Sequence, residues 1–388
     1  MTRAVGALAA ALIVGLVPAP TTTSAPVTTD PTGNGTCRFP GRLTEGTPWP
    51  LQRVLLDELW QDTKGKGVRI AVVDTGVDDV NPQLRLAVDA SAGKDLVGTT
   101  DGTVDEAGHG TKVAGIIAAR PYAGTGFVGL APEATIIPVR QTDGRSSGAA
   151  DAMAEAIDHA IAQGADVVNI SQDTSRPLTA DSPLGRAVAR AVAADVVVVA
   201  SAGNDGKDGR ARNTYPAAFP GVLAVAASDR NDERAAFSQA GGFVGVAAPG
   251  IDIVSTVPGG GQCVDSGTSF SAPYVAGVAA LLRAKYPQWK ASQVVARIQE
   301  TATREGTGRD DALGWGVVDP VRALRGAERG PDEARPLADP APLGAGEERR
   351  SRELRLATYA VAGGGLLVAL VASVCKVLAD GRRRRRAA

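Results

Sequence analysis

Short apolar runs rich in valine and alanine alternate along the chain with longer stretches in which alanine recurs between polar residues. Runs that are apolar at nearly every position are typical of strands buried on both faces. Their alternation with helices predicts an α/β fold, with a mainly parallel sheet between layers of helices. The expected strands are Val68–Val73, Val167–Ile170, Val196–Ala200 and Val222–Ala226, and the expected helices include Ala152–Gln163 and Arg186–Ala194.

This pattern covers residues 51–327, a length that can bury one large core, and the flanking segments differ from it in composition. Residues 1–26 contain a basic residue, an apolar stretch and then small residues, which is the layout of a secretory signal peptide. Residues 27–50 are rich in Thr, Pro and Gly and predict an extended arm. Residues 328–356 are rich in Pro, Ala and charge and predict a flexible linker.

The segment 357–379 is predicted to be a transmembrane helix. Its first part, Ala357–Cys375, contains no charged residue and as a helix would extend over roughly 29 Å. The tail, residues 380–388, contains the run Arg382–Arg386, which the positive-inside rule places in the cytoplasm. The body of the protein is then expected outside the cytoplasm, on a single-pass anchor. The alternative, a buried core helix, fits the length and the arginine block less well.

The formal net charge of −1 gives no general attraction to nucleic acid, so we expect no nucleic-acid partner. Of the three cysteines, Cys375 lies in the predicted membrane span, which leaves Cys37 and Cys263 outside it. In an oxidising exterior these two can form a disulfide, although two separate thiols remain the alternative. No carboxylate-rich loop has the spacing of a calcium site, so we expect no metal and no cofactor, although a calcium site built from scattered ligands remains the alternative.

Two candidate catalytic groups lie in glycine-containing turns. Asp74 comes at the end of the first expected strand, where open α/β sheets place their sites, although a lone Asp there is more often a turn residue. His109 lies in Gly-His-Gly-Thr, just before a helix expected over Lys112–Ala119. The other histidine, His159, is predicted to face solvent, because it lies opposite the apolar stripe of its helix.

Two further candidates can act on a carbonyl group. Ser269 lies in Gly-Thr-Ser-Phe-Ser-Ala-Pro before a helical pattern, with Pro273 expected in the first turn and Thr268 or Ser271 as the N-cap. Backbone N–H groups at that helix start can face a developing oxyanion. Asn204 follows a buried strand and can donate its amide to the same oxyanion, although in isolation it is an ordinary turn residue.

Together these residues form a chemically complete set. Ser269 supplies a nucleophilic hydroxyl, His109 a base, and Asp74 a carboxylate that orients the imidazole. Their order along the chain, Asp then His then Ser, is the order found in subtilisin and not that of chymotrypsin or the α/β-hydrolases.

Four segments that carry this set resemble the signature segments of the subtilisin-like serine proteases, peptidase family S8. They are Val72–Gly76, Gly108–Thr111, Ala200–Asn204 and Gly267–Pro273. The arm with Cys37, the segments Trp49–Gln52 and Gly314–Pro320, and the C-terminal anchor resemble more narrowly the mycosins, membrane-anchored proteases associated with type VII secretion.

The resemblance implies a subtilisin-like three-layer domain in which Asp74 orients His109, His109 is the base, Ser269 is the nucleophile and Asn204 is the oxyanion donor. It also implies an arm that wraps the catalytic domain. One departure concerns the strand edge that normally pairs with the substrate backbone. After Ser171 the family usually continues with Leu-Gly, whereas this chain has Gln172-Asp173.

The sequence therefore predicts a membrane-anchored, extracytoplasmic serine endopeptidase that acts on protein or peptide substrates through an acyl-enzyme, in association with a type VII secretion complex. Two alternatives remain open at this point. The protein can act mainly as a structural component that stabilises such a complex, or as a peptide-processing protease outside type VII secretion.

Overall fold

The structure, a computed structural model, describes residues 37–144, 149–304 and 308–326. The predicted signal peptide, linker, membrane helix and basic tail lie outside these residues. Within the described ranges, no helix combines the length and the apolar character that crossing a bilayer would require.

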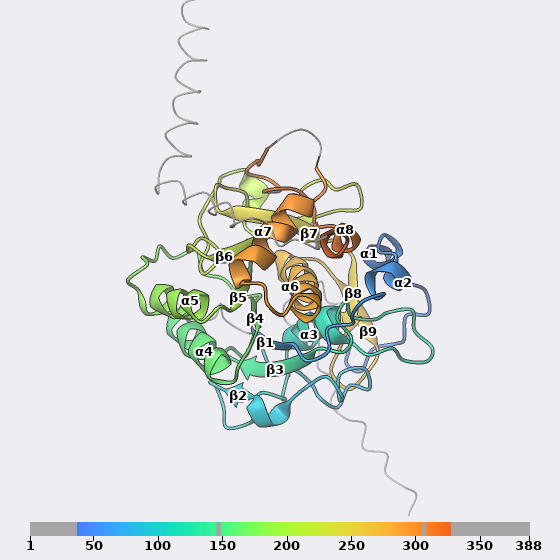
Figure 1. Cartoon of the computed structure of the whole chain (residues 1–388). Coiled ribbons are helices and arrows are strands. Elements are labelled where there is room, and N and C mark those ends of the chain that lie inside the picture. The colour runs from blue at the N-terminus through green and yellow to red at the C-terminus, as the bar shows by residue number, and fades with distance from the viewer. Residues whose placement is uncertain (1–36, 145–148, 305–307, 327–388) are drawn as a thin grey trace, which may run out of the picture.

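A parallel sheet runs through the centre of the described chain (Figure 1). Its strands lie in the order β2-β3-β1-β4-β5-β6-β7, and every neighbouring pair is parallel. This confirms the predicted α/β class with a mainly parallel sheet. The strands are β1 Arg69–Asp74, β2 Lys94–Asp95, β3 Thr135–Arg140, β4 Val167–Ile170, β5 Val197–Ser201, β6 Val222–Ser228 and β7 Val244–Pro249.

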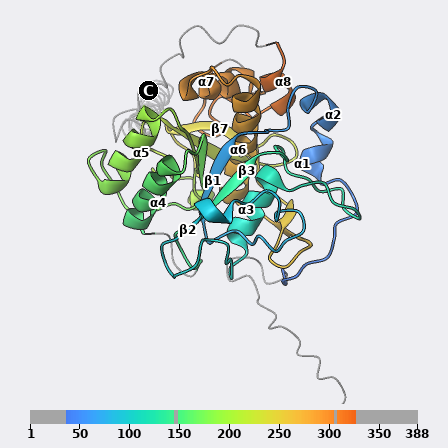
Figure 2. The ribbon, with the colours of Figure 1, turned by 60° about the horizontal axis from the view of Figure 1, so that its bottom comes forward.

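Helices cover both faces of the sheet, which explains why its strands are apolar at almost every position. In β1, Ile70 and Val72 belong to the core that also contains the buried sides of α3 (His109–Ala118), α6 (Thr268–Lys285) and α7 (Ala291–Thr301). Ala71 and Val73 point to the other core, with α4 (Ala150–Ala162) and α5 (Pro183–Ala193). Figures 1 and 2 show α4 beside α5, away from α6 and α3.

The remaining elements lie around this framework. An antiparallel hairpin, β8 with β9, packs against α3, and its register joins Ser255 to Cys263. The short elements are α1 Trp49–Gln52, α2 Leu56–Leu59, α8 Pro320–Leu324, β8 Ile253–Thr256, β9 Gln262–Asp265, and the 3-10 turns η1 Ala90–Ala92 and η2 Gly206–Asp208.

Two local predictions about α6 are wrong. The helix begins at Thr268, so Pro273 lies inside it and not in its first turn. Its N-cap is Gly267, and neither expected cap side chain has that role. Thr268 donates its hydroxyl to Asn204 at 2.9 Å, and Ser271 donates to the Pro249 carbonyl at 3.1 Å.

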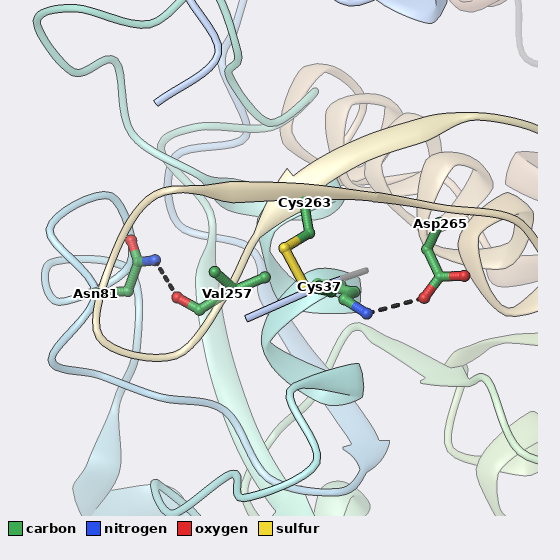
Figure 3. Close-up of a disulfide and its surroundings, with 6 residues drawn as sticks. Cys37, Asn81, Val257, Cys263 and Asp265 are labelled. Atoms are coloured by element: carbon green, nitrogen blue, oxygen red, sulfur yellow. Dashed lines mark hydrogen bonds and ion pairs between the residues drawn. A yellow bond between two sulfur atoms is a disulfide. The ribbon is translucent and has the colours of Figure 1, made fainter. Parts of the chain in front are cut away.

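The described part of the arm is bound along the hairpin and α3. Cys37 and Cys263 form a disulfide with a Cα–Cα distance of 5.8 Å (Figure 3). Gly41 N–H donates to the Gly260 carbonyl at 2.9 Å, which continues the contact beyond the disulfide. The ring of Phe39 fills the space that a Cβ on Gly108 would need, so the arm packs directly over the turn before His109.

Removing this disulfide should destabilise the folded body. It joins residues 226 positions apart, so a Cys37→Ser/Cys263→Ser double variant should lose about 2–5 kcal/mol of unfolding free energy. Urea unfolding followed by tryptophan fluorescence measures the loss. Cys375→Ser, outside the loop, is the control and should unfold like the wild type. Equal midpoints for the double variant and the wild type would contradict the expected contribution.

Candidate active site

The candidate residues gather at the carboxyl ends of β1, β4 and β5. β1 pairs with β3 on one side and with β4 on the other, so the chain adds strands first to one side of β1 and then to the other. Open α/β sheets bind their ligands at such a switch point. Asp74 is the last residue of β1, Ser171 follows β4 directly, and Asn204 follows β5.

Asp74 and His109 form a short, buried hydrogen bond. Nδ1 of His109 lies 2.6 Å from Oδ1 of Asp74, and the two residues are 7% and 0% exposed. The N–H of Thr75 donates to the same carboxylate oxygen at 2.8 Å. With Nδ1 held by the carboxylate, the other ring nitrogen, Nε2, is the one available to exchange a proton with a nucleophile.

A second buried carboxylate, which the sequence analysis did not assign to the site, holds this pair together. Asp105 accepts hydrogen bonds from the Thr75 hydroxyl at 2.7 Å and from the Gly108 N–H at 2.8 Å. It also accepts from the N–H and the hydroxyl of Thr111, at 2.8 and 2.6 Å. Burial raises the pKa of the Asp105 carboxyl, although these hydrogen bonds oppose the rise. Asp105 thus ties the turn after β1 to the first turn of α3.

Ser269 is the second residue of α6 and lies beside the carboxyl end of β4. Its hydroxyl donates to the Ser171 carbonyl oxygen at 3.0 Å, and the Ser171 hydroxyl donates back to the Ser269 carbonyl oxygen at 2.9 Å. In a regular helix, the residue four positions later would donate to that second carbonyl. That residue is Pro273, which has no N–H, so the carbonyl is free to accept from Ser171.

The described hydrogen bonds therefore join Asp74 to His109 but do not join His109 to Ser269. The two helices that carry them are nevertheless packed together, and the ring of Phe270, next to Ser269, lies 5.3 Å from the His109 ring between centroids. A rotation of the Ser269 side chain about χ1 redirects its hydroxyl without any movement of the backbone.

Asn204 is oriented by the start of α6. Its Oδ1 accepts from the N–H and the hydroxyl of Thr268, both at 2.9 Å. The opposite amide atom, Nδ2, lies 3.6 Å from where a Cβ on Gly267 would be. Because Oδ1 is already bound on the protein side, Nδ2 is the atom left to donate to a ligand. Asn204 is itself exposed, so a substrate can reach it.

A buried ion pair lies behind Phe270. Lys112, only 1% exposed, bonds to Asp265 of β9 at 2.8 Å, and its ammonium lies 6.0 Å from the centre of the Phe270 ring. Figure 3 shows Asp265 on the strand that also carries Cys263, so the disulfide-bonded hairpin contacts the helix that carries His109. The pattern of an isolated lysine in an otherwise apolar helix is the sequence signal for this pair.

His159 differs from its prediction. It is partly buried, and its Nε2 lies 2.9 Å from the Ala92 carbonyl oxygen. The helical wheel placed it away from the apolar stripe of α4, but the segment around η1 covers that side. Among the described residues, no group of three or more His, Cys, Asp or Glu side chains is arranged to hold a metal ion.

Comparisons with known proteins agree with this geometry. Residues 65–316 match the model of the subtilase family. Mycosin-4 of Mycobacterium tuberculosis is 36% identical to this chain over 379 residues, which cover 84% of this chain and 81% of mycosin-4.

Solved structures give the same result. A structure of the MycP3 protease from the type VII (ESX-3) secretion system has a TM-score of 0.65 at 36% identity and covers 73% of this chain and 91% of its own. A crystal structure of MycP1 from Mycobacterium smegmatis has a TM-score of 0.69 at 30% identity, with 80% and 92% covered.

The pKa of His109 provides a test of the Asp74 contact. Burial alone disfavours the imidazolium, but the adjacent Asp74 carboxylate outweighs it and raises the pKa of His109 above its usual 6.5. Asp74→Asn removes that charge and leaves the burial, so the titration midpoint of His109 should move to lower pH. NMR of histidine-labelled protein measures the midpoint, and His159→Asn assigns the two resonances. Identical midpoints in the wild type and Asp74→Asn would contradict the electrostatic role.

Proposed function

Because this chain belongs to the subtilase family of serine proteases, we propose that it cleaves peptide bonds with Ser269 as nucleophile, His109 as general base and then acid, and Asp74 as the orienting carboxylate. The observation that carries the proposal is the buried 2.6 Å contact between Asp74 and His109, beside the helix that carries Ser269. A carboxylate held against Nδ1 fixes the tautomer in which Nε2 can accept a proton.

The proposed reaction uses these groups in sequence. Substrate binding displaces the Ser269 hydroxyl from the Ser171 carbonyl, and His109 takes its proton as the oxygen attacks the scissile carbonyl. The amide of Asn204 and the backbone N–H groups at the start of α6 stabilise the oxyanion. His109 then protonates the leaving amine, and a water activated by the same base hydrolyses the acyl-enzyme.

The proposal includes a location and a partner. We infer that the protein is anchored in the cell membrane by residues 357–379, with its catalytic body outside and residues 380–388 in the cytoplasm. The uncharged run and the arginine block of the sequence support this topology. The similarity to a protease from a type VII secretion system supports association with such a system.

A second candidate function is a docking role in the same assembly, with proteolysis secondary. The observation that favours it is the similarity to a structure of the serine protease MycP1, which is described as an essential component of the type VII (ESX-1) secretion system.

Labelling with a membrane-impermeant fluorophosphonate tests the activity and the topology together. Intact cells that express the full chain should label it, and Ser269→Ala and His109→Ala should not react. Asn204→Ala should react about 10²–10³-fold more slowly, because one oxyanion donor is lost. Labelling that appears only after lysis would refute the proposed orientation, and no labelling in either sample would refute the active protease.

Secretion in cells that carry only Ser269→Ala separates the two candidate functions. If proteolysis is the main function, this variant should lose both substrate cleavage and secretion. Secretion at the wild-type level, with cleavage abolished and the variant present in normal amounts, would favour the docking role instead.

A further inference from the structure

The segment after β4, where this chain has Gln172-Asp173, adjoins the nucleophile. Ser171 is bound to Ser269 through two hydrogen bonds, and Thr174 pairs with Tyr215 through N–H···O bonds of 3.0 and 2.9 Å. Asp173 lies between these two fixed points. Its position in the site is therefore set by the backbone on both sides.

The Asp173 side chain extends toward the loop that carries Asn204. Its Oδ2 lies 3.2 Å from the place that a Cβ on Gly203 would take, and Gly203 has a φ of +98°. Asp173 lies two residues after Ser171, which bonds to Ser269, and its carboxylate lies beside Gly203, the residue before Asn204. A substrate carbonyl bonded to Ser269 with its oxygen at Asn204 would bring its own residue close to Asp173. Asp173 therefore lies at the subsite for the residue before the scissile bond.

The negative charge of the Asp173 carboxylate has no cationic partner among the described residues. Within the described ranges, Asp173 has no hydrogen bond or ion pair. The neighbouring loop carries three cations: Arg212 is paired with Asp208, and neither Lys207 nor Arg210 forms an ion pair with Asp173. Burial, and then the nearby Asp205 carboxylate, raise the pKa of Asp173 to about 6. The group is thus largely ionised at pH 7, partly desolvated and beside a like charge.

A second polar side chain, that of Gln239, also lies beside Gly203. Gln239 is 1% exposed, and its Cγ lies 3.5 Å from the same Cβ position on Gly203. Neither amide atom of Gln239 has a hydrogen-bond partner among the described residues. A buried amide without partners is costly, and a ligand donor beside Asp173 would satisfy its oxygen.

We propose that Asp173 is a specificity-determining residue that selects a lysine or arginine side chain on the substrate residue before the scissile bond. The inference rests on the proposed protease function. A cationic side chain would pair with a carboxylate that is partly buried and otherwise unpaired among the described residues, and a large apolar side chain in the same place would desolvate it further. Charge-assisted hydrogen bonds of this kind correspond to a preference of about 10- to 100-fold.

Two peptidyl phosphonate probes that differ only in this residue test the inference. One carries lysine and the other norleucine, which has the same chain length without the charge. The ratio of their rates of inactivation of the full chain is independent of the amount of active enzyme. The ratio should exceed about tenfold for the wild type at pH 7.5 and fall toward one for Asp173→Asn.

The pH dependence is a second measurement on the unmodified protein. The preference for lysine should decline as the pH falls through about 6, because Asp173 becomes protonated there. Asp205→Asn is the matched control. It removes the neighbouring charge, so the preference should persist and its decline should move to lower pH.

The outcomes distinguish this inference from the function on which it rests. A wild-type ratio near one, in protein that a neutral fluorophosphonate labels, would overturn the role of Asp173 and leave the protease intact. A ratio unchanged in Asp173→Asn would overturn it as well. Protein that no probe labels would refute the proposed function, and the inference with it.

Discussion

The hydrogen bond between Asp74 and His109 is the contact on which the site depends. Asp74 is fully buried at the end of β1, and its Oδ1 accepts from the Thr75 N–H and contacts the imidazole, whereas its Oδ2 has no partner among the described residues. Asp105 stabilises this geometry, because it accepts hydrogen bonds from Thr75, just after β1, and from Gly108, just before α3. Because both acids are buried, neither can change its partners without a large desolvation penalty.

The second half of the site is organised by the start of α6. Pro273 frees the Ser269 carbonyl for Ser171, and Thr268 orients Asn204. The proposed nucleophile, Ser269, and the proposed oxyanion donor, Asn204, are therefore positioned by the same helical turn, whereas the proposed base, His109, lies on α3. Catalysis in this arrangement depends on how α3 and α6 pack, and Phe270 lies at that contact.

The parallel sheet and the strands that deliver Asp74 and Asn204 could be predicted, because one apolar run ends directly at Asp74 and another ends in the short segment just before Asn204. β3 gives a weaker signal, because it contains Pro138, a residue that strand interiors normally exclude. It is tolerated there because β2 pairs only with Val139 and Arg140, so Pro138 has no partner on that side.

The details of the site were harder to predict for a different reason. The contribution of Ser171 depends partly on its backbone carbonyl, and that of Asp105 on four contacts made at once. The orientation of the Ser269 hydroxyl is a rotamer, which composition and spacing do not specify. The proline predicts a first turn at Pro273, whereas α6 begins five residues earlier, where Thr268 bonds to Asn204 and Ser269 to Ser171.

The central proposal is that Ser269, His109, Asp74 and Asn204 form one active site with α3 and α6 packed as they are in the structure. A crystal structure of the full chain with a peptidyl boronic acid measures this most directly. The account predicts boron bonded to Ser269 Oγ, His109 Nε2 within hydrogen-bonding distance of the adduct, and Asn204 Nδ2 bound to a boronate oxygen, with the backbone of α6 unchanged. An adduct that forms elsewhere, or that forms only after α6 or α3 has shifted, would contradict it.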